Sequence, residues 1–249
     1  MTVGCGRILL TGGTGRLGCE LKSLLPEVIA PSRAELDITQ PETIEAALRR
    51  FAPAVVVHTA AYTDVAAAER DRQACWRTNV HGTRAVVQAV AQRGVFLVQI
   101  STDYVFEGTR GMYTEEDPPG PVCNYYALSK LVAEEVARLA PRHLIIRTSF
   151  RPRQWPYPVA FADVHTSQDY VDVIAPEIAL AIQHHRDIPY STLHIATERK
   201  SVYELARRRR PDVRPGSKRE VGVALPDDIS LDTSRWQTLK RQWGGVGLS

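Results

Sequence analysis

Residues 7–18 read Arg7-Ile8-Leu9-Leu10-Thr11-Gly12-Gly13-Thr14-Gly15-Arg16-Leu17-Gly18. The apolar run before Thr11 predicts a strand, and apolar residues at helical spacing over 17–25 predict a helix. Between them, Gly12 permits a tight turn, Gly15 lets the backbone approach a pyrophosphate, and Gly18 allows close packing of the helix on a sheet. An ordinary strand-turn-helix is the plainer interpretation of three glycines alone, but their place in the first strand-helix unit favours a dinucleotide-binding turn.

Strand and helix patterns alternate along the chain as far as about Phe150. We expect strands at 27–31, 54–58, 95–100 and 143–147, and helices at 41–50, 71–92 and 126–139. This alternation predicts an α/β fold with a doubly wound, mostly parallel Rossmann-type sheet, in a dinucleotide-binding domain at residues 1–150. Ligands bind beyond the carboxyl ends of the strands in such sheets, so we expect one cleft near Gly12, Ala60, Thr102 and Thr148.

The pattern changes after Phe150, and we expect residues 151–249 to form a small C-terminal substrate-binding cap, partly packed on the first domain. Residues 151–170 are rich in proline and aromatic side chains and are too irregular for a strand-helix repeat. We expect them either to form a rigid loop that shapes a pocket or to pack their aromatic rings against the body of the protein. Further on, the patterns predict helices at 171–183 and 201–208, a short strand at 192–196, and a last helix that begins within 230–236.

The composition is ordinary for a globular protein. The chain has 249 residues, of which 44% are hydrophobic and 24% charged, and this fits one core with a small cap and excludes a disordered class. A net charge of +3 from scattered arginines predicts no nucleic-acid partner, and the dense run at 207–210 is expected at a solvated helix end. We find no membrane-spanning stretch and no signal peptide before the first strand, so we expect a cytoplasmic protein without membrane contact.

The cysteines are Cys5, Cys19, Cys75 and Cys123. Their spacing matches neither a CxxC pair nor a metal-binding motif. This pattern predicts reduced thiols and no metal site.

Tyr126 and Lys130 stand four residues apart in a predicted helix, so they lie on the same face, one turn from each other. An ammonium near a phenol favours the phenolate and lowers the pKa of the phenol from about 10 toward neutrality. Such a tyrosine is a proton donor at physiological pH. The spacing occurs by chance in many helices, and an exposed helix face is the plainer interpretation, but the glycine motif predicts a cofactor beside this tyrosine.

The chain resembles the extended short-chain dehydrogenases/reductases, and among these it is most similar to the dTDP-4-dehydrorhamnose reductase family. The motifs that carry the resemblance are 11–18, 35–39, 59–63, Asn79, 101–106, 126–130 and 147–149. The run Ser-Thr-Asp-Tyr-Val-Phe at 101–106 is close to a signature of this family, and the similarity covers residues 7–150. It implies NADPH-dependent reduction of the 4-keto group of a nucleotide-linked deoxysugar, as in dTDP-rhamnose biosynthesis.

The resemblance also implies roles for individual residues. Thr102, Tyr126 and Lys130 match the catalytic trio: Tyr126 gives its proton to the carbonyl oxygen, Thr102 hydrogen-bonds to that oxygen, and Lys130 holds the nicotinamide ribose. The residues that fall where the family contacts its sugar nucleotide are Val65, Thr102, Tyr104 and Phe150. The residues that match cofactor-binding positions are Gly12, Thr14, Gly15, Arg16, Leu17, Gly18, Asp37, Ile38, Ala60, Ala61, Tyr62, Asn79, Tyr126 and Lys130.

The residues after the second expected strand bear on the choice between NADP and NAD. An acid at this place binds the ribose 2′-hydroxyl of NAD and repels the 2′-phosphate of NADP. Here the chain continues as Ala30-Pro31-Ser32-Arg33, with no acid before Glu35. We therefore expect Ser32 and Arg33 to bind the cofactor and NADP(H) to be preferred, with NAD(H) as the alternative, although Arg33 also suits an ordinary surface position.

Three features depart from the family pattern. Phe150 stands where tryptophan is usual, the stretch at 151–169 is short, and the family's Gly-Ser-Pro-Thr run appears as Thr166-Ser167-Gln168-Asp169. Two other functions therefore stay open: an NAD-dependent nucleotide-sugar epimerase or dehydratase, and a non-catalytic NADP-binding regulator that resembles the regulatory subunit of methionine adenosyltransferase. Related enzymes often dimerise through the helices expected here at 71–92 and 126–139, whose polar outer faces suit a homodimer and solvent alike.

Overall fold

The computed structural model describes residues 6–220 and 225–244. The described residues form two compact units, the first over 6–101, 124–146 and 175–191 and the second over 102–123, 147–174, 192–220 and 225–244. The boundaries of these units differ from the expected domains at 1–150 and 151–249. The segment 102–123 belongs to the second unit because it is hydrogen-bonded to residues late in the chain. The amide of Tyr113, for example, donates to the carbonyl of Ser230 at 2.9 Å.

The first unit is built on a sheet whose strands are β1 (Ile8–Thr11), β2 (Val28–Ile29), β3 (Val55–His58), β4 (Phe96–Thr102) as far as residue 101, and β5 (His143–Thr148) as far as residue 146. Their order is β5-β4-β3-β1-β2, and β1 pairs in parallel with β2 and β3, as β3 does with β4. The doubly wound, mostly parallel sheet predicted from the sequence is confirmed. Strands β1 and β3 are buried along their whole length, as expected of a parallel sheet covered on both faces.

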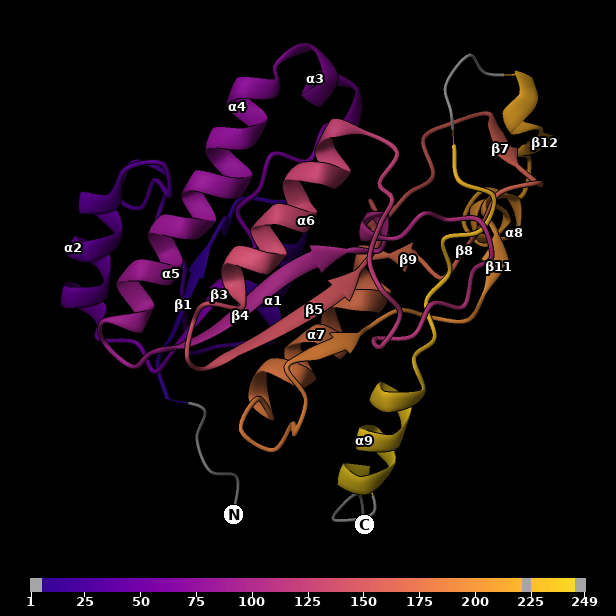
Figure 1. Ribbon diagram of the computed structural model, residues 1–249. Coiled ribbons are helices and arrows are strands. Elements are labelled where there is room, and N and C mark those ends of the chain that lie inside the picture. The colour runs from indigo at the N-terminus through magenta and orange to yellow at the C-terminus, as the bar shows by residue number, and fades with distance from the viewer. Residues whose placement is uncertain (1–5, 221–224, 245–249) are drawn as a thin grey trace. The chain divides into compact units, whose positions relative to one another are not determined.

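The helices of the first unit are α1 (Arg16–Leu24), α2 (Pro41–Phe51), α3 (Val65–Arg70), α4 (Arg72–Trp76), η1 (Arg77–Gly82), α5 (Thr83–Ala91), α6 (Tyr125–Ala137) and α7 (Val171–Gln183) from residue 175 onward. Helices α2, α5 and α6 lie side by side across one face of the sheet (Figure 1). The helix expected at 71–92 is divided into α4, the π-helical turn η1, and α5. Asn124 fixes the start of α6, because its side chain accepts from the amide of Ala127 at 2.8 Å.

The core under these helices is aligned by the strand register. Leu9 stands opposite Val56, and Val56 opposite Leu97, so the three side chains form a row across the sheet. This row packs in one cluster with Leu48 of α2 and Val90 of α5. Each such side chain stabilises the fold by about 1.5–3 kcal/mol when fully buried. The packing thereby brings the carboxyl ends of β1, β3 and β4 to one edge, where the candidate site begins.

The elements of the second unit are η2 (Asp103–Val105), β6 (Phe150–Arg151), β7 (Val159–Phe161), β8 (His165–Thr166), β9 (Asp169–Tyr170), β10 (Thr192–His194), β11 (Lys200–Ser201), α8 (Val202–Arg207), β12 (Arg214–Gly216), η3 (Lys218–Glu220) and α9 (Ser234–Gly244). Short pairs join β11 to β8, β12 to β7 and β6 to β9. Trp155 is 6% exposed in an apolar cluster with Val164 and Val202, and Phe161 packs against it. Trp155 and Phe161 thus follow the second expectation, in which the aromatic rings of 151–170 pack against the protein, whereas Tyr157 is exposed.

The cysteines, the membrane-spanning segments and the metal-binding groups can each be examined in the described residues. Cys19 and Cys123 are exposed, Cys75 is buried, and Cys5 lies outside the described residues. Among the described residues, no helix is both long and apolar enough to cross a membrane. Within the same part of the chain, His, Cys, Asp and Glu side chains form no group of three that could hold a metal ion.

Candidate active site

The loop between β1 and α1 leaves no room for side chains at two of its glycines. Gly12 has a φ of +73°, and a Cβ on it would lie 2.7 Å from the amide nitrogen of Ala60. A Cβ on Gly18 would lie 2.3 Å from the carbonyl oxygen of Gly12. Gly15 is the N-cap of α1, so the first backbone N–H groups of this helix have no side-chain cap, as at helix N-termini that bind a pyrophosphate. The other predicted cofactor residues of the loop are the exposed Thr14 and Arg16 and the buried Leu17.

Ser32 and Arg33 follow β2, and both are bonded to carboxylates. The amide and the hydroxyl of Ser32 each donate to Oε2 of Glu35 at 3.0 Å. These hydrogen bonds lower the pKa of Glu35. Arg33 donates from Nε to Asp37 at 3.3 Å, but its side chain is 79% exposed. The structure therefore places an acid directly beside Ser32, although Glu35 stands three residues further along the sequence.

Asp37 and Ile38 are held in place by the segments that surround them. Oδ1 of Asp37 accepts from the amide of Thr39 at 2.9 Å. Ile38 is buried, and its Cδ1 lies 2.7 Å from the place that a Cβ on Gly82 would take. A side chain at Gly82 would therefore require Ile38 to shift.

Asn79 holds the loop that follows β3. Its Oδ1 accepts from the amide of Tyr62 at 2.7 Å, and its Nδ2 donates to the carbonyl of Tyr62 at 3.1 Å. Ala60 and Ala61 precede this anchored residue, and Ala60 also packs on Gly12. Asn79 is buried in the π-helical turn η1, and such turns are frequent at functional sites. The structure thus brings Asn79 and the 60–62 loop together, as a cofactor site there requires.

Tyr126 and Lys130 lie in the first turns of α6, and both are buried, with 9% and 5% of their surface exposed. Nζ of Lys130 donates to the carbonyl oxygen of Ile100 in β4 at 2.8 Å. Burial lowers the pKa of Lys130 to about 8, while the carboxylate of Glu134 acts in the opposite direction. Because this pKa stays above about 7, the ammonium remains the main form at neutral pH. A buried cation therefore lies one helical turn from the tyrosine.

Glu134 is one of the polar residues expected on the outer face of the helix at 126–139, and the structure contradicts this expectation. This side chain is fully buried, and its two oxygens accept from the hydroxyl of Ser101 and from Nη2 of Arg138, each at 2.8 Å. Glu134 thereby joins α6 to the carboxyl end of β4. A signal for it exists in the sequence, because Tyr126, Lys130 and Glu134 follow one another at intervals of four on the same helix.

Three of the predicted substrate residues belong to the second unit. Thr102 follows Ser101 directly, its Oγ1 donates to the carboxylate of Asp103 at 3.0 Å, and it accepts from the amide of Tyr104 at 3.3 Å. Burial raises the pKa of Asp103 to about 6 and that of Tyr104 to about 12. Phe150 begins β6 in this unit. Val65 instead opens α3 in the first unit.

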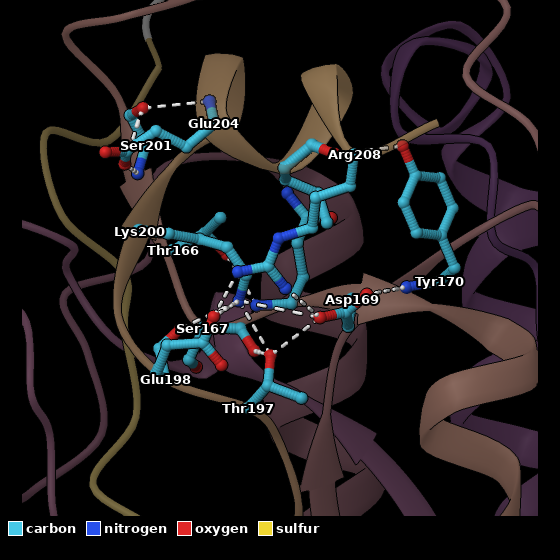
Figure 2. Close-up of polar contacts among 12 residues, drawn as sticks. Thr166, Ser167, Asp169, Tyr170, Thr197, Glu198, Lys200, Ser201, Glu204 and Arg208 are labelled. Atoms are coloured by element: carbon cyan, nitrogen blue, oxygen red, sulfur yellow. Dashed lines mark hydrogen bonds and ion pairs between the residues drawn. The ribbon is translucent and has the colours of Figure 1, made fainter. Parts of the chain in front are cut away.

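Figure 2 shows a polar cluster of the second unit that the sequence analysis missed. The buried carboxylate of Asp169 accepts from Nη1 of Arg208 at 2.9 Å and from the hydroxyl of Thr197 at 3.1 Å. Lys200 is also buried, and its Nζ donates to Thr197 at 2.7 Å and to the carbonyl of Glu198 at 2.8 Å. Asp169 ends the Thr-Ser-Gln-Asp run, so in this chain that run ties β9 to α8 and to the loop before β11.

Sequence comparisons agree with this geometry. The family model for the RmlD substrate binding domain matches residues 6–154. A dTDP-4-dehydrorhamnose reductase from Aggregatibacter actinomycetemcomitans is 36% identical over 151 residues, 58% of this chain and 51% of its own. One from Burkholderia thailandensis is 40% identical over 149 residues, 58% of this chain and 50% of its own. The chain thus spans about half the length of the curated relatives it matches.

Solved structures extend the similarity beyond the matched segment. The dTDP-4-dehydrorhamnose reductase from Bacillus anthracis, in complex with NADP, has a TM-score of 0.82 at 28% identity, over 94% of this chain and 91% of that one. A hypothetical dTDP-4-dehydrorhamnose reductase from Sulfolobus tokodaii has a TM-score of 0.81 at 33% identity, over 94% of both chains. The UDP-glucose 4-epimerase from Thermus thermophilus, in complex with NAD, has a TM-score of 0.72 at 22% identity and shares the fold alone.

Proposed function

The chain belongs to the RmlD substrate binding domain family, and from this premise we propose that it is an NADPH-dependent reductase of the 4-keto group of a nucleotide-linked deoxysugar. One observation carries the proposal: a buried tyrosine and a buried lysine lie one turn apart on α6, and the lysine is bonded to the carboxyl end of β4. The names of the relatives and of the similar structures support dTDP-4-dehydrorhamnose as the substrate.

The glycine-rich loop fits a dinucleotide, because a Cβ on Gly12 or Gly18 would occupy the space where the backbone turns. The NADP in the Bacillus anthracis structure supports NADP(H) as the cofactor of this chain. The exposed guanidinium of Arg33 supplies the charge that a 2′-phosphate requires. Glu35, beside Ser32, is the group that would favour NAD(H). The preference for NADP(H) therefore depends on the balance between Arg33 and Glu35.

The side chains of this site divide the work of the reaction. Bound NADPH supplies the hydride that reduces the carbonyl carbon. Tyr126 donates its phenolic proton to the carbonyl oxygen, which becomes a hydroxyl group. The ammonium of Lys130 stabilises the phenolate that remains and holds the nicotinamide ribose. The hydroxyl of Thr102, which donates to Asp103 in this structure, turns to the carbonyl oxygen and stabilises the charge that develops there.

The sugar nucleotide is assigned to Val65, Thr102, Tyr104 and Phe150 by their match to family positions. Tyr104 is half-buried, and its raised pKa keeps the phenol neutral, so it can donate a hydrogen bond to the substrate. Phe150 offers an apolar face to a sugar ring or base. The short strands at 150–170 replace the longer stretch of the family, and we propose that they limit which sugar is accepted.

The test of the proposal is NADPH oxidation by the purified protein in the presence of dTDP-4-dehydrorhamnose. We expect one NADPH to be consumed for each keto sugar reduced. An epimerase or dehydratase would convert a nucleotide sugar with no net loss of added NADPH. A non-catalytic regulator would bind NADPH but leave a whole panel of keto-sugar nucleotides unchanged. Either of these outcomes would contradict the proposal.

We also propose a cytoplasmic homodimer that pairs α4, α5 and α6 of one protomer with those of its twin. The outer faces of these helices carry ion pairs, such as Arg72 with Glu69 and Arg138 with Glu135. Paired charges of this kind can exchange partners across an interface. A monomeric mass by light scattering at micromolar protein concentration would contradict the homodimer.

A further inference from the structure

His58 is a polar residue at the centre of the first unit. It ends β3 after three valines and is 1% exposed. Its Nδ1 lies 2.7 Å from the hydroxyl of Thr11, the last residue of β1 before the glycine loop. Its Nε2 lies 3.2 Å from the hydroxyl of Thr83, the first residue of α5. One imidazole thus joins the end of β1, directly before the glycine loop, to the start of α5.

The surrounding donors decide which nitrogen of His58 carries the hydrogen. The hydroxyl oxygen of Thr11 accepts from the amide of Ala60 at 3.3 Å, and its own hydrogen can point to Nδ1. The hydroxyl of Thr83 donates to the carbonyl of Asn79 at 2.6 Å, so its oxygen accepts from Nε2. Nε2 therefore carries a hydrogen, and in the neutral ring Nδ1 accepts from the hydroxyl of Thr11. Burial supports this state, because it lowers the pKa of His58 to about 3.

The chain of hydrogen bonds continues from Asn79 into the helix of the catalytic tyrosine. Nδ2 of Asn79 donates to the hydroxyl of Ser129 at 2.8 Å. That hydroxyl donates to the main-chain carbonyl of Tyr126 at 2.7 Å. Asn79 and Ser129 are both buried, so each bond lies in a region of low dielectric, where it is strong and costly to break.

We propose that His58 is a positioning residue for the reduction. Together with Thr11, Thr83, Asn79 and Ser129 it holds the glycine loop and the first turn of α6 in one hydrogen-bonded frame. The frame sets the distance between the cofactor, which the loop binds, and the phenol of Tyr126. This inference rests on the proposed function, since it names what keeps the two halves of that site in register.

A purely structural role predicts a different behaviour. Loss of one buried hydrogen bond would then lower stability and leave hydride transfer unchanged in the protein that is still folded. A positioning role predicts slower hydride transfer in the folded protein, because misplacement of reacting groups by about 1 Å can cost up to about 100-fold. The two roles are separated by measuring rates per folded molecule.

The test uses Thr11→Val and Thr83→Val, since each removes one hydroxyl of the frame and keeps the size of the side chain. We expect each variant to slow single-turnover hydride transfer about tenfold or more, with a change of less than about threefold in the dissociation constant of NADPH. Once either link is broken the frame is open, so the double variant should be no slower than the slower single variant. Losses that multiply in the double variant, or rates equal to wild type, would overturn the proposal.

Ser230→Ala is the matched control. Its hydroxyl is fully buried and has two bonds, to Asp228 at 2.6 Å and from the amide of Met112 at 2.8 Å, in the second unit. We expect this variant to lose stability while its hydride-transfer rate stays at the wild-type value. An equal slowing in Ser230→Ala would show that any lost buried hydroxyl has this effect, and it would remove the special role of His58.

A second measurement needs no turnover. Amide hydrogen exchange of the protein without cofactor reports on the peptide that covers residues 125–130. We expect Thr11→Val to speed exchange in this peptide, although Thr11 lies in β1 and the peptide in α6. Faster exchange confined to residues near Thr11 would overturn the frame. A wild-type protein that reduces no keto sugar would overturn the proposed function but leave this result standing, so the two failures are distinguishable.

Discussion

Tyr126 and Lys130 are both buried, so an exposed helix face does not describe them. A phenol that is 9% exposed is shielded from bulk water, so its proton goes to a bound partner more readily than to solvent. The ammonium of Lys130 is held by the carbonyl of Ile100, which directs it back to the carboxyl end of β4. Single substitutions therefore test the chemistry at the scale of one atom.

Tyr126→Phe should abolish reduction and leave the affinity for NADPH nearly unchanged. The substitution removes the proton donor but keeps the ring and its packing, and loss of a general acid costs roughly 10²–10⁴ in rate. Turnover is measured with a keto-sugar nucleotide that the wild type reduces, and affinity by calorimetric titration. Tyr190→Phe, at a more exposed tyrosine of the same unit, is the control and should keep full activity.

Lys130→Met gives the contrasting pattern, with both turnover and NADPH affinity reduced, because the ammonium serves the phenol and the ribose. Full activity of Tyr126→Phe would contradict the mechanism. If Lys130→Met lost turnover with unchanged NADPH affinity, the ribose contact assigned to this lysine would be wrong.

Arg33→Ala should weaken NADPH binding by about tenfold or more and barely affect NADH, because a charge-assisted bond to the 2′-phosphate is worth about 1.5–3 kcal/mol. Both dissociation constants are measured by calorimetry. Arg93→Ala, which removes an arginine paired with Glu45, controls for the change of net charge. Tighter binding of NADH than of NADPH by the wild type would refute the assigned preference.

At the scale of elements, the helix over 72–91 changes from α to π and back, and the middle turn carries the groups that join neighbouring elements. Asn79 in this turn holds the loop after β3 by two bonds to Tyr62. Gly82 lies close to Ile38, which would have to shift if Gly82 carried a Cβ. The start of α5 then supplies Thr83 to His58. A π turn contains one residue more than a turn of α-helix, so in a regular α-helix these side chains would point in other directions. We infer that the π turn is part of the candidate site.

The neutral His58 at the end of β3 makes stability depend on pH. Its pKa is about 3 in the folded protein against about 6.5 when unfolded. Below about pH 6.5 the unfolded state takes up a proton that the folded state does not, so the stability of the fold decreases as the pH is lowered. Between about pH 7.5 and about pH 5 the loss attributed to His58 is about 2 kcal/mol. Lys130, whose charge also opposes protonation of the ring, stays cationic through this range.

The measurement compares urea unfolding of wild type and His58→Gln at the two pH values. Asp103 opposes the trend, since its raised pKa favours the folded state as pH falls toward about 4, but it is common to both proteins and cancels in the difference. We expect the free-energy difference between the two proteins to shrink by about 2 kcal/mol at the lower pH. A difference that does not change with pH would mean that His58 is not held neutral.

At the scale of the whole molecule, the two units interleave along the chain, and the first is completed only by residues 175–191. Helix α7 contributes Ile178 and Ile182 to this stretch, and both are fully buried. The carbonyl of Ser191 accepts from the amide of Ile145 at 2.8 Å, which secures strand β5. A cut after the last predicted strand therefore removes part of the dinucleotide-binding unit.

A fragment of residues 1–150 should fail to unfold cooperatively, whereas a fragment of residues 1–191 should retain a urea transition. The shorter fragment loses two buried isoleucines at about 1.5–3 kcal/mol each, a large share of the about 5–15 kcal/mol that stabilises a typical domain. Circular dichroism during the titration is the measurement. Equal cooperative transitions in both fragments would show that residues 175–191 are dispensable for the first unit.

The features that local pattern was enough to predict are the parallel sheet, the glycine turn and the helix that carries Tyr126 and Lys130. Each depends on residues close together in sequence: the apolar runs of the strands, the spacing of three glycines, and the four-residue interval on one helix. Such signals survive because strand alternation, helix period and backbone sterics act over a few residues. The family resemblance added the roles of Thr102, Asn79 and the substrate residues to that local account.

What the sequence left undecided is set by contacts between residues far apart in the chain. His58 meets Thr83 across 25 positions, Ser101 meets Glu134 across 33, and Asp169 meets Arg208 across 39. A single sequence shows no spacing rule for such pairs, because they are chosen by strand register and helix packing. The neutral state of His58 and the return of residues 175–191 to the first unit exist only once the chain has folded, since burial and distant partners create them.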